Sequence, residues 1–315
     1  MSGVAHEHAP AVPGRAMDTR LWMTVGLNSV ITVVEVAGGL VAGSLALLAD
    51  AAHNLTDVAA VILALAARRL ARRPPTVRHT YGFKRAEVIA ALANALVLIA
   101  VTALIAREGL YRLLHPAPVA QGIMLAVALV ALAANAGSVF LLRRHDEDDI
   151  NVRSAFLHLL QDSLASLAVV IAALLAHTEV GLYVDPVAAI AVGLAVLHGA
   201  VALVWETLST LLEGAPGSVD LEDLVRSTGE AFAPACLHHV HLWQNGPGQR
   251  LLTAHVALGR DMDGAAIEAL FAEIKAFLRQ RWGVTHATLE PEVTGCGETA
   301  VIAHWHDEHG DEHTG

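Results

Sequence analysis

The chain has 315 residues, of which 55% are hydrophobic and only 16% are charged, and its mean hydropathy is +0.51. Soluble domains carry roughly 25% charged residues, so this composition argues against an ordinary soluble protein. The net charge of −11 is concentrated in residues 213–315, which contain 16 acidic and 6 basic side chains against 15 and 14 in residues 1–212; because this acidic part would repel phosphate groups, nucleic acid is not expected as a partner.

Apolar segments dominate the chain from residue 21 to residue 210. Residues 1–20 are polar and lack an apolar run, so they predict a short N-terminal tail rather than a signal peptide. About 20 apolar residues span a bilayer, and residues 88–106 and 117–142 contain no Asp, Glu, Lys or Arg. We expect an all-α bundle of six transmembrane helices, near residues 21–43, 46–68, 87–112, 119–142, 154–177 and 186–210.

The basic residues predict how these helices are oriented, because cytoplasmic loops are rich in Lys and Arg. The N-terminal tail and the loops after the second and fourth expected spans carry twelve such residues, and the opposite side carries two, Arg107 and Arg112. We therefore expect a multi-pass protein of the inner (cytoplasmic) membrane with both termini in the cytoplasm.

Two His–Asp pairs lie inside expected spans, where ionisable side chains are costly and are functional candidates by default. His53 and Asp57 are in the second span, and His158 and Asp162 are in the fifth. Residues four apart share one helix face. The two pairs together offer two imidazole nitrogens and two carboxylate oxygens, a set suited to tetrahedral Zn²⁺. Either pair alone could instead be a buried hydrogen bond that supports only its own helix.

An internal repeat relates the two pairs. Each member of the second pair follows its counterpart by 105 residues, and the flanking sequences HNLTDVAAVILALAA and HLLQDSLASLAVVIAALLA resemble each other. A repeat of three spans inverts its second copy in the membrane, so the second and fifth spans would run antiparallel. Inverted repeats with a site between them are a transporter architecture. The sequence therefore favours a transport site.

Other polar residues in the expected spans indicate a function less specifically than the two His–Asp pairs do. Glu35 could line the cytoplasmic entrance, or it could pair with a nearby arginine or with water. Asp50, three residues before the first histidine, could contact metal that leaves the site or could cap its helix. Asn135 predicts a hydrogen bond between helices. Asp185, which precedes a proline, predicts the N-cap of the sixth helix.

Beyond residue 213 the pattern becomes that of a small α+β domain. It predicts, in order, a helix, two strands, a helix and a strand, over residues 220–232, 238–244, 250–258, 263–281 and 286–292. This α-β-β-α-β order fits two helices on one face of a sheet, with Ser218 as the cap of the first helix.

Two cysteines, Cys236 and Cys296, are too few for a disulfide framework, so we expect reduced thiols. The expected parts are a tail (1–20), a transport domain (21–212), a cytoplasmic metal-binding and dimerisation domain (213–295) and a His- and acid-rich disordered tail (296–315).

In combination, these motifs resemble the cation diffusion facilitators, and most closely their bacterial zinc-efflux branch. Besides the two HxxxD pairs, the matching segments are Tyr81–Glu87, Asn151–Ala155, Asp185–Pro186 and His238–Trp243. The resemblance implies a homodimeric six-span antiporter that exports Zn²⁺ in exchange for protons, with a metallochaperone-like (ferredoxin-like) cytoplasmic domain. The transport site that it implies consists of His53, Asp57, His158 and Asp162, and a histidine at the first of these positions goes with zinc over cadmium. No organic cofactor is expected.

The resemblance also suggests metal ligands outside the spans. Some members bind regulatory metal in the cytoplasmic domain, and the matching candidates here are His238, His255, Glu290 and Glu292, with His286 as a further one. Strand histidines can equally be surface residues, and alternation would place His239 and His241 on one face and His238 on the other. Of three loop positions that hold metal in some members, this chain matches only at His79. Histidines of the C-terminal tail could capture Zn²⁺ weakly: His304, His306, His309 and His313.

Competing interpretations change the cargo or the function. The same mechanism could carry mainly Cd²⁺, Co²⁺, Fe²⁺ or Mn²⁺. A membrane-bound zinc sensor would need an output segment, and nothing in the sequence resembles one. An intramembrane metalloenzyme would need an HExxH-type pair or an open metal position, and the sequence has no HExxH. We therefore expect a transporter and not an enzyme, with zinc, protons and the lipid bilayer as its partners.

Overall fold

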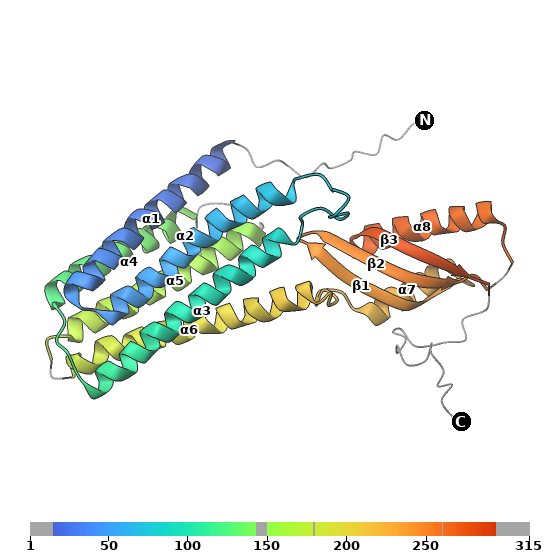
Figure 1. The fold of residues 1–315 in the computed structure, drawn as a ribbon. Helices are drawn as coiled ribbons and strands as arrows, with labels where there is room; N and C mark the ends of the chain where they lie inside the picture. The colour runs from blue at the N-terminus through green and yellow to red at the C-terminus, as the bar shows by residue number, and fades with distance from the viewer. Residues whose placement is uncertain (1–14, 143–149, 179, 260, 294–315) are drawn as a thin grey trace, which may run out of the picture. The chain divides into compact units, whose positions relative to one another are not determined.

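The computed structural model of the protein describes residues 15–142, 150–178, 180–259 and 261–293 (Figure 1). The chain divides into two compact units. The first comprises Met1–Ile62 and Asn94–Ala202, and the second comprises Leu63–Ala93 and Leu203–Gly315. Each unit is described by itself below.

Long apolar helices make up the chain as far as residue 211. They are α1 (Arg15–Ala42), α2 (Leu45–Ala71), α3 (Ala86–Leu114), α4 (Gln121–Leu142), α5 (Ile150–Leu175) and α6 (Gly181–Leu211). Helices α2, α3 and α6 are long and apolar enough to cross a membrane, and α1, α4 and α5 contain shorter apolar stretches among the residues described. A helix satisfies its own backbone hydrogen bonds, so such segments suit a bilayer.

The core of the first unit consists of small and branched side chains from several helices. Leu47 of α2, Met124 of α4, Val169 of α5 and Ala189 of α6 are all fully buried in one cluster. Helix α1 approaches α4 closely at Gly38, where a Cβ atom would lie 2.6 Å from Cγ2 of Val127. Small residues allow this kind of close approach between apolar helices. The core cluster therefore brings α2, α4, α5 and α6 together, and α1 packs against α4.

Asp185 caps α2 rather than α6, which corrects the expectation from the sequence. Helix α6 begins at Gly181, so Asp185 lies inside it. The buried Asp185 carboxylate accepts hydrogen bonds from Ser44 Oγ (2.5 Å), from the Leu45 amide (2.8 Å) and from the Ala46 amide (3.2 Å). The first amides of a helix have no partner within that helix. A residue of α6 therefore holds the start of the helix that contains the first His–Asp pair.

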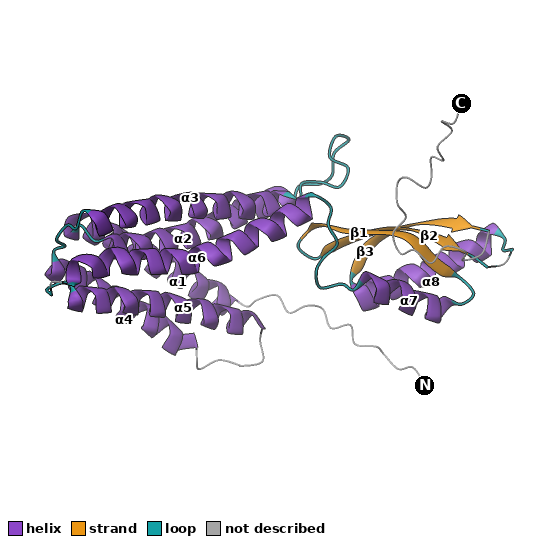
Figure 2. Cartoon of the chain, turned by 90° about the horizontal axis from the view of Figure 1, so that it is seen from below, coloured by secondary structure: helices purple, strands orange, loops and turns teal. Residues whose placement is uncertain are grey.

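The second unit contains a three-stranded sheet with two helices on one face (Figure 2). Its elements are α7 (Leu221–Phe232), β1 (Cys236–Gly246), β2 (Gln249–Ala257), α8 (Gly264–Trp282) and β3 (Val284–Glu292). Strand β2 lies in the centre, antiparallel to β1 and parallel to β3. A parallel pair needs a crossover connection, and α8 supplies it. The helices and the sheet enclose an apolar core that includes Leu224, Leu252, Ile274 and Leu278.

Two local expectations for this unit are wrong. The cap of α7 is Asp220, whose side chain accepts from the amides of Glu222 and Asp223. Ser218 Oγ instead accepts a hydrogen bond from Arg250 Nη2 at 2.9 Å. Cys236 is disulfide-bonded rather than reduced; Cys296 lies outside the described residues.

Within the second unit, the end of β1 contacts the residue before α3 and the last residues of α6. Arg85 Nη2 lies 2.7 Å from Glu213 Oε1, and Arg85 Nε donates to Asn245 Oδ1 at 3.0 Å. Gln244 Nε2 donates to Thr210 Oγ1 at 3.2 Å. Arg85 thus joins the segment after α6 to the end of β1.

Candidate metal centre

Three of the four expected transport ligands come together in the first unit. Helix α2 supplies His53 and Asp57, one turn apart, and α5 supplies Asp162. Their ligand atoms all lie within 4.8 Å of one another. His53 Nε2 is 3.3 Å from Asp162 Oδ1 and 3.8 Å from Asp57 Oδ2. The fourth residue, His158, lies in α5 one turn before Asp162, and its side chain is outside the described ones.

The chemistry of this cluster suits a divalent transition-metal ion. His53 is 8% exposed, Asp162 is 1% exposed, and the side chain of Asp57 is 26% exposed. Buried charges in proteins are paired or coordinate metals. One imidazole and two carboxylates form a mixed nitrogen and oxygen set, which favours Zn²⁺ and its neighbours over Mg²⁺ or Ca²⁺.

A buried polar layer lies beside the cluster, toward the start of α2. Asn54 Nδ2 donates to Glu35 Oε2 at 2.8 Å, and Ser166 Oγ donates to Asp50 Oδ2 at 2.9 Å. Asn135 Nδ2 donates to Ser166 Oγ at 3.1 Å, so the hydrogen bond between helices predicted for Asn135 is confirmed. Glu35 and Asp50 are both fully buried. A role at a cytoplasmic entrance for Glu35, or in metal release for Asp50, stays a prediction.

Ser166 and Asn54, which support this layer, are not among the residues predicted from the sequence. Ser166 follows Asp162 by four residues and therefore lies on the same face of α5. A polar residue at that spacing in an apolar helix is the feature that would have identified it. Asn54 offers no comparable periodicity, because its role depends on the packing of α1 against α2.

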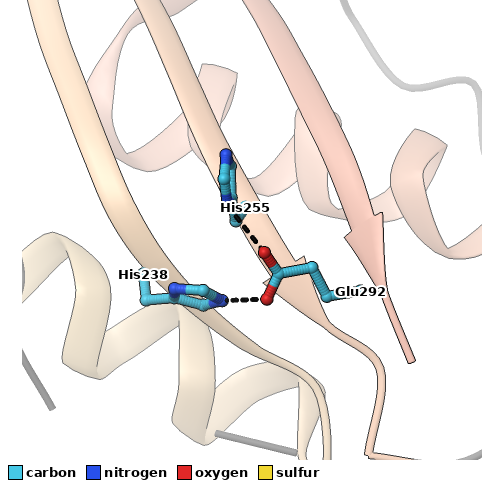
Figure 3. A group of neighbouring side chains, drawn as sticks. All are labelled: His238, His255 and Glu292. Carbon is cyan, nitrogen blue, oxygen red and sulfur yellow. Dashed lines mark hydrogen bonds and ion pairs between the residues drawn. The ribbon is translucent and has the colours of Figure 1, made fainter. Parts of the chain in front are cut away.

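A second cluster spans the three strands of the sheet. Figure 3 shows the Glu292 carboxylate of β3 between the rings of His238 and His255, with one oxygen directed at each ring. Glu292 Oε2 is 2.8 Å from His238 Nε2, and Glu292 Oε1 is 2.7 Å from His255 Nδ1. Ligand atoms of the three residues lie within 4.8 Å of one another. The cross-strand register, which pairs His238 with His255, produces this meeting.

An irregularity in β1 changes the expected alternation of its histidines. The register with β2 shifts between His238 and His241, and His239 has φ = 49°. The ring of His239 therefore lies 4.7 Å from that of His255 and 5.0 Å from that of His241. The contact between His239 and His241 agrees with the face predicted for these two, but His238 also contacts the His255 ring, at 5.5 Å, so its predicted place on the opposite face is wrong. Burial, and then the neighbouring His239 and His255, lower the pKa of His241.

Glu290 borders the second cluster, and the remaining candidates lie apart from both clusters or outside the described residues. Glu290 is 72% exposed, with Oε2 3.7 Å from His255 Nε2. His286 is exposed, and its ring lies 6.3 Å from that of Tyr81. His79 is exposed in the loop after α2, and its ring lies 4.5 Å from that of Phe83. The tail candidates fall outside the described residues: His304, His306, His309 and His313.

Comparisons with known proteins agree with this arrangement. Residues 21–212 match the model of the cation efflux transmembrane domain. The zinc transporter ZitB of Escherichia coli (strain K12) is 39% identical over 93% of this chain and 94% of that protein. The metal cation efflux system protein CzcD of Cupriavidus metallidurans is 32% identical, over 96% of this chain and 94% of that protein. A cadmium, cobalt and zinc/H(+)-K(+) antiporter of Bacillus velezensis is 29% identical over 97% and 94%. The chain therefore belongs to the cation efflux family, as its resemblance to the cation diffusion facilitators predicts.

Proposed function

We propose that this protein exports Zn²⁺ from the cytoplasm in exchange for protons. The observation that supports this most directly is the meeting of His53, Asp57 and Asp162 inside an apolar helical unit. The names of the relatives, a zinc transporter, a metal cation efflux system protein and an antiporter for cadmium, cobalt and zinc, agree with such a cargo.

In this proposal His158 completes a tetrahedral set with the three clustered residues. The carboxylates bind Zn²⁺ when ionised and the imidazoles bind it when neutral, so metal loading displaces protons. Movement of α1, α2, α4 and α5 relative to α3 and α6 then exposes the site to the outside. Protons from outside compete for the same groups and release the metal.

We further propose six spans in the inner membrane, with both termini cytoplasmic and with α1–α3 and α4–α6 as an inverted repeat. The support is the apolar character of the six helices and the excess of basic residues on one side. The parts of the chain would be the N-terminal tail (1–20), the transport domain (21–212), the cytoplasmic domain (213–295) and the His-rich tail (296–315). A homodimer is the proposed assembly, by resemblance to the family.

The cytoplasmic cluster is the proposed regulatory metal site. Glu292 lies between two imidazoles on adjacent strands, so a divalent cation there would gain one carboxylate and two nitrogen ligands. Glu290 is exposed and is the cross-strand partner of His255, so rotation of its side chain could add an oxygen as the fourth ligand. The tail histidines would raise the local concentration of zinc near this domain.

Flux measurements in sealed vesicles containing the purified full-length protein test the proposal. Zn²⁺ uptake driven by a proton gradient should fall by at least about 100-fold in Asp57→Ala and in Asp162→Ala, because each removes a ligand. Glu206→Gln is the matched control, since Glu206 is an exposed carboxylate in α6 that belongs to neither group of candidate ligands. Wild-type flux in either alanine variant would contradict the proposal. The same assay with Cd²⁺, Co²⁺, Fe²⁺ and Mn²⁺ identifies the preferred cargo.

A further inference from the structure

Two carboxyl groups of the first unit face each other inside the protein. Glu35 on α1 accepts a hydrogen bond from Asn54, which lies one turn after Asp50 on the same face of α2, and both carboxyl groups are fully buried. One oxygen of each is satisfied, by Asn54 and by Ser166 respectively. The other two oxygens, Glu35 Oε1 and Asp50 Oδ1, accept no hydrogen bond from any residue that the structure describes.

A proton shared by the two carboxyl groups gives these oxygens a hydrogen bond and removes the repulsion between two negative charges. Two carboxylate charges about 4 Å apart repel by about 4 kcal/mol even at an effective dielectric of 20, and two ionised carboxylates have no donor between them. With one proton on the pair, one carboxyl O–H donates to the facing oxygen, and the repulsion disappears. Asp185, buried in the same unit, has three donors and needs no such proton.

We propose that Glu35 and Asp50 form a proton-binding site, separate from the metal ligands, that holds one exchangeable proton of the transport cycle. This rests on the proposed exchange of zinc for protons. Asp50 lies one helical turn before His53, about 5 Å along α2. The titratable groups that act on the pair are His53 from α2 and Asp162 from α5.

Because the carboxyl pair lies close to the metal cluster, binding at one of these two sites affects binding at the other. A divalent cation at the cluster repels the shared proton, which leaves the carboxyl oxygen for water as Zn²⁺ binds. When Zn²⁺ departs, one proton returns to the same pair, so the only bond broken and re-formed is O–H. Linkage is reciprocal, so a proton on the pair weakens zinc binding by the factor by which zinc weakens proton binding.

The test compares Glu35→Gln and Asp50→Asn with wild type and with Glu206→Gln. Each amide keeps an oxygen that can accept from Asn54 or Ser166 and removes the titratable carboxyl. Calorimetric titration of Zn²⁺ into the full-length protein, in buffers of different protonation enthalpy, gives the protons released per zinc. Zinc bound by the cytoplasmic domain contributes equally in all four proteins and cancels in the comparison.

We expect each of the two variants to release about one proton fewer per zinc than wild type and Glu206→Gln, with the zinc Kd at alkaline pH retained within about threefold. An unchanged number of protons in both variants would overturn the proposal. Loss of zinc binding at every pH would also overturn it, since the pair would then belong to the metal ligands. If the wild-type protein itself released no protons on binding zinc, that result would contradict the proposed exchange of zinc for protons rather than the role of the carboxyl pair alone. The two substitutions are on different helices, so a folding defect in one variant does not imply a defect in the other. The comparison can be made with either variant that folds.

Discussion

Replacing Asp185 with alanine tests whether α6 fixes the start of α2. The Asp185 carboxylate accepts from Ser44 Oγ at 2.5 Å and from the amides of Leu45 and Ala46 at 2.8 and 3.2 Å. The alanine variant leaves both buried amides without an acceptor. Ser44 keeps part of its capping role, because its Oγ still accepts from the Leu47 amide at 3.1 Å.

The size of the effect follows from these contacts. A buried amide that loses its acceptor costs about 1–3 kcal/mol, so two of them cost about 2–6 kcal/mol. Because both are at the end of a helix, where the chain can shift to reach water, we expect about 2–4 kcal/mol. Asp185→Asn keeps one acceptor oxygen and should lose about half of this. Asp220→Ala, which removes an exposed cap from α7, should cost about 1 kcal/mol.

Hydrogen exchange of the purified full-length protein, followed by mass spectrometry, measures this loss locally. A cost of 2 kcal/mol raises the opening constant about 30-fold, so amides in the first turn of α2 should exchange at least that much faster in Asp185→Ala. Asp220→Ala should leave this turn unchanged and accelerate exchange only at the start of α7. Unaltered protection of the first turn of α2 in a folded Asp185→Ala protein would refute the capping role.

Three further predictions concern the second unit. Glu292→Gln removes the charge between the rings of His238 and His255, so the zinc affinity of this cluster should fall at least about tenfold in calorimetry; an unchanged affinity would place the metal elsewhere. Arg85→Gln breaks a partly exposed ion pair with Glu213 and removes a donor from the buried Asn245 side chain, so the free energy of unfolding should fall by about 1–3 kcal/mol, and unchanged thermal unfolding would contradict the joining role of Arg85. Burial and neighbouring histidines lower the pKa of His241. The unfolded chain therefore takes up this proton first, and stability that is complete above about pH 6.5 is lost as the pH falls. His241→Gln should weaken that dependence in melting curves recorded between about pH 7 and 5, and an identical dependence would exclude His241 as its source.

Local patterns in the sequence predict many elements of the fold. Apolar residues at helical spacing predict a helix at 263–281, and α8 runs from Gly264 to Trp282. The start of α6 is different. An aspartate before a proline is typical of a helix start, yet α6 begins four residues before Asp185. Its carboxylate is committed to α2 instead, and that contact joins residues about 140 positions apart, beyond the reach of any local pattern.

The same distinction applies to the candidate sites. His53, Asp57 and Asp162 are evident in the sequence because ionisable residues at a spacing of four are rare in apolar helices. The contact between Glu35 and Asp50 depends on how α1 packs against α2. The irregular register at His239 depends on the pairing of β1 with β2 and on a positive φ that histidine seldom adopts. Neither feature can be recognised from the local sequence pattern.

The buried carboxylates of the first unit differ in what neutralises them, and this assigns each a different role. Asp185 faces amide and hydroxyl donors, Asp57 and Asp162 face an imidazole, and Glu35 and Asp50 face each other. A carboxylate away from water needs hydrogen-bond donors, a cation or a proton. Replacing each by its amide separates the three cases. At Glu35 or Asp50, where the pair already shares a proton, the amide should preserve the fold. At Asp185 it should keep about half of the helix cap. At Asp57 or Asp162 it should fail to support metal binding, because a neutral oxygen cannot offset the charge of a divalent metal.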